Sequence, residues 1–74
     1  MTREAIKRVL GVQPFKPFQL RLTDGALVPV AHPEFIALSE TGRTAVVMTH
    51  GDDFKIVDMA LVTALEFDGL GKSG

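Results

Sequence analysis

The segment that decides the fold lies between residues 18 and 27 and reads Phe18-Gln19-Leu20-Arg21-Leu22-Thr23-Asp24-Gly25-Ala26-Leu27. Apolar and polar residues alternate at its start, which is the period of a strand with one buried face. The dipeptide Asp24-Gly25 favours a type I′ hairpin turn, which needs positive φ at both central residues. We therefore expect a β-hairpin with Thr23 opposite Ala26 and Leu22 opposite Leu27.

A short amphipathic helix is expected before this hairpin, over residues 2–11. Thr2 is a suitable N-cap, and Gly11 suits the position after the last turn. The apolar side follows the i, i+3, i+4 spacing of a helix face and consists of Ile6, Val9 and Leu10. A helix this short is not stable in isolation, so it must pack on the rest of the protein.

The link from helix to hairpin is Pro14-Phe15-Lys16-Pro17-Phe18. Each proline fixes its own φ and favours extended geometry in the residue before it, so the helix cannot continue here. Aromatic side chains strongly favour burial. We therefore interpret the two phenylalanines as part of the core rather than as a ligand platform.

The second strand of the hairpin is expected over residues 26–31, and further short strands are expected over residues 35–38, 44–49, 54–57 and 62–67. Pro29 lacks a donor for the strand ladder and therefore indicates an edge strand or a bulge. His32-Pro33 interrupts the pattern, and one long strand bent there fits the sequence as well as two short ones. Residues 44–49 are apolar on both faces, which is typical of a central strand covered on both sides.

We expect one domain over residues 1–68, with tight turns between its strands. Gly42 is the expected residue of positive φ in the turn over residues 39–43, and Asp58 can cap a single helical turn before the last strand. The sequence predicts a mostly β fold: a short N-terminal helix followed by a five-stranded, strongly bent antiparallel barrel of the Sm-like or SH3-like type. Residues 69–74 are expected to form a flexible tail.

Size and charge limit the functions that this chain can have. It has 74 residues and no cysteine, so disulfides and cysteine zinc sites are excluded, and oligomerisation is the common remaining route to stability. Its 8 basic and 9 acidic residues give a net charge of −1, whereas nucleic-acid-binding domains are usually basic. No apolar run is long enough for a signal peptide or a membrane span, so we expect a cytoplasmic protein that does not enter the membrane.

We expect no catalytic activity, no cofactor and no metal site. No motif places a general base beside Ser39 or another hydroxyl nucleophile. The candidate metal ligands lack the spacing that makes a zinc site recognisable, and their composition is typical of turns. These ligands are His32, Glu34, His50, Asp52 and Asp53.

The closing segment Ile56-Val57-Asp58-Met59-Ala60-Leu61-Val62-Thr63, together with the order of elements from Ile6 to Phe67, resembles the Sm-like fold of the Sm, LSm and Hfq proteins. The resemblance implies a ring in which the fourth strand of one subunit pairs with the fifth strand of the next. The corresponding strands here are residues 54–58 and 62–67. The interface residues implied are Phe54, Ile56, Val57, Val62, Ala64 and Leu65.

A second resemblance rests on motifs spread along the chain. It is to small uncharacterised bacterial proteins that carry PF.PF, DG, HP.F and ID…VT.LE, and it implies no particular activity. The motifs stand here as Pro14-Phe15-Lys16-Pro17-Phe18, Asp24-Gly25, His32-Pro33-Glu34-Phe35, and Ile56-Val57-Asp58 with Val62-Thr63-Ala64-Leu65-Glu66.

Three functions follow as hypotheses. The first is a homo-oligomeric binding or scaffolding module, because strands that are apolar on both faces exceed what one small barrel interior absorbs. The second is an RNA-binding Sm-like ring, and the third is a regulatory partner subunit of a larger enzyme. The residues expected to contact a nucleic acid or another ligand are Arg3, Lys7, Arg8, His32, Arg43 and His50.

The RNA-contacting motifs of the Sm-like family are not reproduced in this chain. The first Sm motif has an Asp and an Asn in a turn that corresponds here to Glu40-Thr41-Gly42-Arg43. The Lys-His pair of Hfq falls near Asp58-Met59, which is neither basic nor aromatic. The first hypothesis is therefore preferred to the second.

Overall fold

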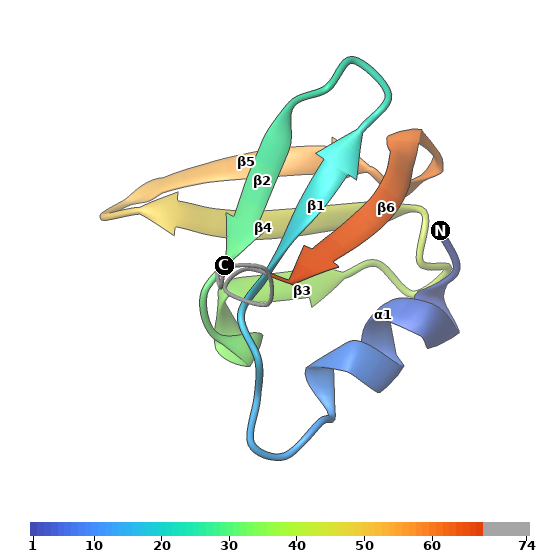
Figure 1. Cartoon of the computed structure of the whole chain (residues 1–74). Coiled ribbons are helices and arrows are strands. Elements are labelled where there is room, and N and C mark those ends of the chain that lie inside the picture. Colours follow the sequence, from blue (N-terminus) through green and yellow to red (C-terminus); the bar gives the residue numbers. More distant parts are fainter. Residues whose placement is uncertain (68–74) are drawn as a thin grey trace.

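The computed structural model describes residues 1–67. They form one α-helix, six strands and two single 3₁₀ turns (Figure 1). In chain order these are α1 (Arg3–Leu10), β1 (Phe18–Leu22), β2 (Leu27–Val30), η1 (Pro33–Phe35), β3 (Ile36–Leu38), β4 (Thr44–His50), β5 (Asp53–Asp58), η2 (Met59–Leu61) and β6 (Val62–Phe67). The mostly β class and the N-terminal helix are confirmed, and the tail predicted over residues 69–74 lies outside the described residues.

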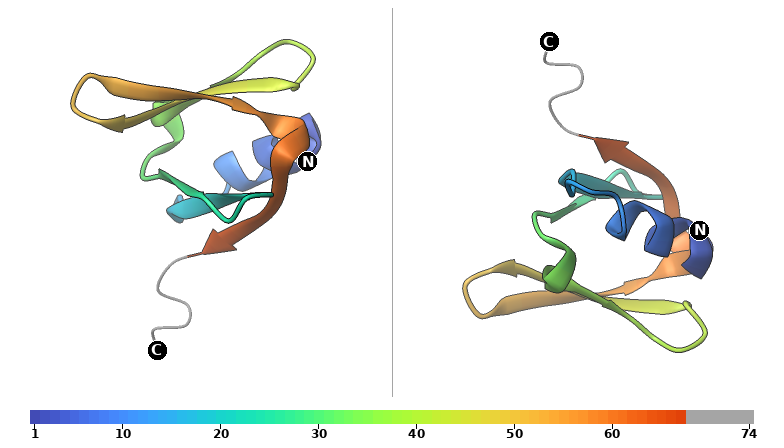
Figure 2. Two further views of the ribbon diagram at one scale, coloured as in Figure 1. Left: turned by 90° about the horizontal axis from the view of Figure 1, so that it is seen from above. Right: turned by 90° about the horizontal axis from the view of Figure 1, so that it is seen from below.

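The strands form two antiparallel three-stranded sheets, with the orders β2-β1-β6 and β3-β4-β5. The sheets face each other, and α1 lies across one open end between them (Figure 2). Within residues 1–67, no strand pairing joins the sheets into a closed barrel. The core fills the space between them and consists of Ile6, Phe18, Leu20, Val28, Val30, Ile36, Ala45, Val47, Val57, Met59 and Val62.

The caps of the short helical elements follow the sequence prediction. The Thr2 hydroxyl accepts a hydrogen bond from the backbone N–H of Ala5 at 3.2 Å, which caps α1. The Asp58 carboxylate accepts one from the N–H of Ala60 at 3.0 Å, which caps η2. Ile6 is fully buried, so α1 is held by its apolar side as expected.

The β1–β2 hairpin is present, but its predicted turn type and register are wrong. Gly25 has φ 90°, and among the described residues no non-glycine residue has positive φ, which excludes a type I′ turn at Asp24-Gly25. The N–H of Leu22 instead bonds to the carbonyl of Ala26 at 2.9 Å around a three-residue loop. This register pairs Leu20 with Val28 and so places the apolar residues of both strands on the same side.

The interruption at His32-Pro33 separates two strands rather than bending one. Pro33 begins η1, and the strands on either side of η1 belong to different sheets. Phe35 therefore lies in the 3₁₀ turn, and β3 starts at Ile36, one residue later than predicted. Pro29 lies in β2, which is an edge strand, as its missing N–H requires.

Strand β4 is central in its sheet, as predicted, but only one of its faces is covered. Ala45 and Val47 are fully buried, whereas Val46 and Met48 on the opposite face are exposed. The expectation of a strand covered on both sides is therefore wrong for the single chain. Successive side chains of a strand point to opposite faces of its sheet, so every second side chain of β4 points away from the β2-β1-β6 sheet. No other described element covers that outer face (Figure 2).

The turn between β3 and β4 is packed tightly against the start of α1. Gly42 has φ 78°, which confirms its predicted conformation. Its N–H bonds to the carbonyl of Ser39 at 2.9 Å. A Cβ added to Gly42 would overlap the Cβ of Arg3 and come within 3.2 Å of its Cα. The first turn of the helix and this loop thus approach each other as closely as only glycine allows.

Replacing Gly42 by alanine is therefore expected to destabilise the protein twice over, through left-handed strain and through overlap with Arg3. We expect a loss of about 2–4 kcal/mol in the free energy of unfolding, measured by urea denaturation. Gly25→Ala is the matched control, since Gly25 also has positive φ but has no heavy atom within 4 Å of the added Cβ. That control should lose only about 1 kcal/mol. Equal losses in the two variants would contradict a close approach of α1.

Candidate functional site

The outer side of the β3-β4-β5 sheet is unusually apolar for a sheet surface in contact with water. The register pairs Val46 with Ile56 and Met48 with Phe54 across the β4–β5 ladder. The exposed fractions of these four residues are 37%, 68%, 37% and 56%, in that order. Ala37 of β3 lies opposite Val46 and is also exposed. We call this surface the outer apolar face; its members are Ala37, Val46, Met48, Phe54 and Ile56.

The outer side of the other sheet shows the pattern expected for a face in contact with water. There the register places Gln19 opposite Glu66 and Arg21 opposite Ala64. The Nε–H of Arg21 donates a hydrogen bond to Oε2 of Glu66 and forms an ion pair with it. An antiparallel sheet with one solvated side normally alternates apolar-in and polar-out. Strands β1 and β6 follow that rule, whereas β2 exposes Leu27 and Pro29 on the same side, and the outer side of β3-β4-β5 departs from the rule across all three strands.

The ion pair perturbs both of its members. The hydrogen bond from Arg21 is the largest effect on Glu66 and lowers the pKa of its carboxyl below the usual range. The same bond raises the pKa of the Arg21 guanidinium. About two-fifths of each side chain is exposed to water, at 41% and 40%, so solvent screens the attraction between the charges.

The interface residues implied by the Sm-like resemblance fall into two groups. Phe54 and Ile56 are exposed on β5, which is an edge strand. Val57 and Val62 belong to the core, so their side chains are already covered within the chain. Ala64 and Leu65 are half-buried on β6, the edge strand of the other sheet.

A groove lies beside the edge strand β5. It has a volume of about 500 Å³ and runs between the β1–β2 hairpin, the end of β5 and η2. Leu27, Ile56 and Leu61 line it and are well exposed, at 41%, 68% and 47%. Asp24, Lys55 and Asp58 line it as well, so apolar and charged side chains share the groove side of β5.

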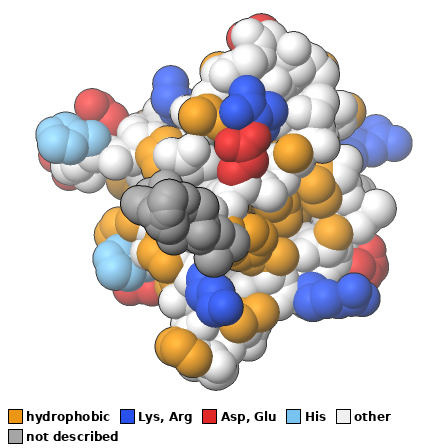
Figure 3. Space-filling model, viewed as in Figure 1, with side chains coloured by type: hydrophobic (Ala, Val, Ile, Leu, Met, Phe, Trp, Pro, Cys, Tyr) orange, Lys and Arg blue, Asp and Glu red, His pale blue; other side chains and the backbone are white. Residues whose placement is uncertain are grey.

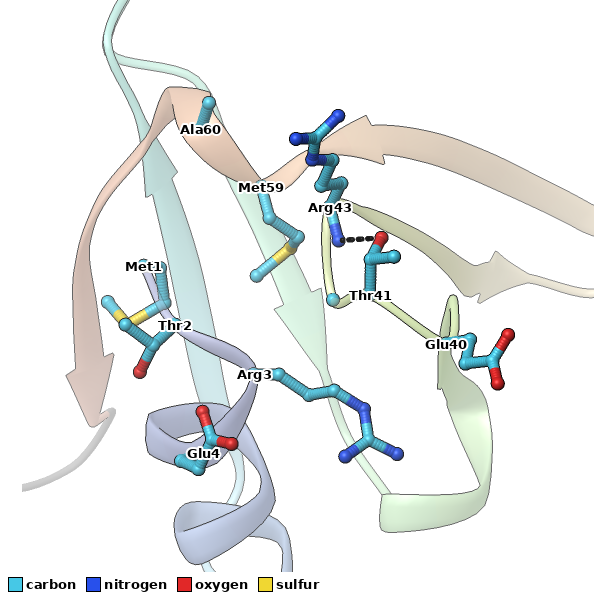
Figure 4. A pocket seen from close by; sticks show the side chains of 10 residues that line it. Met1, Thr2, Arg3, Glu4, Glu40, Thr41, Arg43, Met59 and Ala60 are labelled. Carbon is cyan, nitrogen blue, oxygen red and sulfur yellow. Dashed lines mark hydrogen bonds between the residues drawn. The ribbon is translucent and has the colours of Figure 1, made fainter.

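A second pocket lies between the start of α1, the β3–β4 turn and η2, with a volume of about 540 Å³. It brings together two of the predicted contact residues, Arg3 and Arg43. Figure 4 shows that their side chains come from different walls and that the guanidinium groups point in different directions. Glu4 and Glu40 also line the pocket, so its charge is mixed.

The other predicted contact residues are not brought together. Lys7 and Arg8 are exposed on α1. His32 packs edge-on against Phe35, with ring centroids 4.9 Å apart, and His50 ends β4 at the far tip of the β4–β5 hairpin. In the part of the chain that the structure describes, no three His, Asp or Glu side chains form a possible metal site. Figure 3 shows Lys and Arg side chains spread over that view rather than gathered in one patch.

Val46 and Met48 are the residues that the sequence-based list of interface positions missed. The signal was present, because residues 45–48 are apolar at successive positions, inward and outward alike. The list of interface positions came from the Sm-like resemblance and covered only residues 54–58 and 62–67, and the central strand was expected to be covered on both sides. A three-stranded sheet with one packed partner leaves the outward half of its central strand exposed.

Comparison of the chain with protein-family models, with curated proteins and with solved structures finds no match. Among residues 1–67, no helix has both the length and the apolar character needed to cross a membrane. The geometry described above is therefore the basis for the function proposed below.

The Arg21–Glu66 pair predicts a pH dependence of stability. The pKa of Glu66 is lower in the folded chain than in the unfolded one, so its ionised form stabilises the fold above the ordinary glutamate pKa of about 4.3. This contribution is lost as the pH falls through the lower, folded pKa. We expect Glu66→Gln to be less stable than the wild type at pH 6–7, and the difference to shrink below about pH 4.

The measurement is chemical denaturation at a series of pH values between neutral and acid. Glu40→Gln serves as the control, because Glu40 is an exposed carboxyl with no ion pair shown within residues 1–67. Its difference from the wild type should vary less with pH. A Glu66→Gln difference that stays constant down to acid pH would contradict the role of the ion pair.

Proposed function

We propose that this chain is a small homo-oligomeric binding or scaffolding module, and that its copies join through the edges of β5 and β6. The observation that supports this most directly is the exposure of Phe54 and Ile56 on an edge strand. Unpaired strand edges carry free N–H and C=O groups and are ready to pair with another chain. Natural proteins usually protect such edges with charges, and β5 carries Asp53, Lys55 and Asp58 beside its apolar residues Phe54, Ile56 and Val57.

The two edges belong to different sheets, so a contact between β5 of one copy and β6 of the next is head-to-tail. A head-to-tail contact repeats from copy to copy and closes into a ring when the rotation per step allows it. This arrangement is the one that the Sm-like resemblance implies. The groove beside β5 adds room for apolar side chains of a neighbouring β6. We extend the proposal to the fold itself, as an Sm-like arrangement of two strongly bent sheets.

A second candidate function is binding of single-stranded RNA by such a ring. The observation that favours it is the pocket that brings Arg3 and Arg43 together beside the start of α1. Two arginines at one opening can contact adjacent phosphates, and a helix start adds a partial positive charge. The acidic residues in the same pocket and the net charge of −1 make this the weaker candidate.

The oligomer proposal predicts a mass that is a multiple of 8.0 kDa when the purified protein is measured by size exclusion with light scattering at micromolar concentration. Ile56→Asp should weaken assembly by roughly 10- to 100-fold, since a fully buried isoleucine contributes about 1.5–3 kcal/mol. Phe35→Asp is the control: Phe35 is 37% exposed, and η1 lies by the opposite edges of the two sheets. A folded wild-type monomer would overturn the proposal.

The RNA candidate predicts salt-dependent binding of a single-stranded oligonucleotide, measured by fluorescence anisotropy. Replacing Arg3 and Arg43 by alanine should weaken binding and reduce the slope of log K against log salt by about 1.4, at 0.7 per phosphate contact. The control replaces Arg8 and Lys16 by alanine, which removes the same charge outside the pocket. Equal effects in the two double variants, or no binding at low salt, would dismiss this candidate.

A further inference from the structure

The outer apolar face is uncharged across the whole width of its sheet. One row across the strands joins Ala37, Val46 and Ile56, and the next joins Met48 and Phe54. Charged positions in the register lie at the two ends of the ladder, where Asp58 pairs with Thr44 and Asp53 pairs with His50. The largest apolar patch on a soluble protein, typically about 300–600 Å², is often functional. The outer side of β1 and β6 carries Gln19, Arg21 and Glu66, so a sheet of this fold can present polar and charged side chains there.

The chemistry of the face suits a second copy of the same face. In a two-fold contact each patch meets itself, so a charged patch would repel its own copy, whereas an uncharged one does not. Interfaces between identical subunits are also the most apolar class, while a polyanion or a charged ligand would find no partner here. Two sheets can pack face to face about 10 Å apart with interleaved side chains. Met48 and Phe54 are long enough to interleave in this way.

The area of the face sets how the contact works. Three strands about 4.8 Å apart, along the seven residues of β4, give a footprint of roughly 300 Å². A stable pair of proteins needs about 800 Å² from each partner. One face contact is thus too small to hold two lone copies together. Two assemblies that make several such contacts at once bind each other much more tightly than two single copies do. After the first contact forms, the others are intramolecular and form at a high effective concentration.

We infer that the outer apolar face joins two assemblies, each formed through the edges of β5 and β6, face to face. The complete particle then contains two such assemblies with the same number of copies. This inference rests on the proposed assembly through β5 and β6, which supplies the repeated contacts. It adds a second, two-fold interface whose central residues lie on β4. Because β4 is bonded on both sides within its own sheet, substitutions in it leave the edges of β5 and β6 unchanged.

The test is native mass spectrometry of the full chain carrying Val46→Thr together with Met48→Thr. Threonine keeps a high strand propensity but makes the face polar. We expect the variant to have half the mass of the wild-type particle. Val12→Thr is the matched control, since Val12 is 40% exposed in the link after α1, close to the 37% of Val46. The control should keep the wild-type mass, and circular dichroism should show both variants folded.

The outcomes separate the two interfaces. A variant with the wild-type oligomeric mass overturns the face inference and leaves the edge proposal standing. A wild type of two copies with a monomeric variant overturns assembly through the edges and, with it, the inference that the face joins two sets of copies. A wild-type monomer overturns both.

Discussion

The structure depends on the packing of two small sheets against a single shared layer of apolar side chains. Each sheet has only three strands, so its inward face supplies a few residues, among them Leu20, Val28, Val47 and Val57. The opening at one end is closed by α1 through Ile6. The turn η2 links the sheets: Met59 N–H bonds to the carbonyl of Arg43, and the Leu61 carbonyl accepts from Thr23 N–H. All of these contacts border the same core.

The same constraint explains how much of the fold follows from the sequence. Local signals predict the helix, its cap at Thr2, the left-handed Gly42 and the capped turn at Asp58, because each depends on neighbours in the chain. The hairpin register depends on both strands together. Pairing the apolar faces of β1 and β2 requires Leu20 opposite Val28, and this requires a three-residue loop. Asp24-Gly25 alone favours a two-residue loop, so the local signal gives the wrong register.

The candidate site is predicted less well, and for a different reason. The exposure of a residue depends on what lies beyond its own sheet, which strand periodicity does not specify. Alternation with Lys55 places Phe54 and Ile56 on one face of β5 without specifying which face is outward, and Val46 and Met48 stand in a run without polar residues. Arg3 and Arg43 are forty residues apart in the chain, and only the close approach at Gly42 brings them to one pocket.

The apolar content of this short chain is therefore divided between two tasks. The core needs only the inward positions of the strands and one side of α1. Outward positions with the same composition add less to the stability of a single copy, and exposed apolar side chains favour unspecific association. A threonine or lysine at such a position would satisfy the strand as well and avoid that association. The outer apolar face is consistent with a chain whose surface is completed by other copies, so that the unit of stability is the assembly rather than the 74-residue chain.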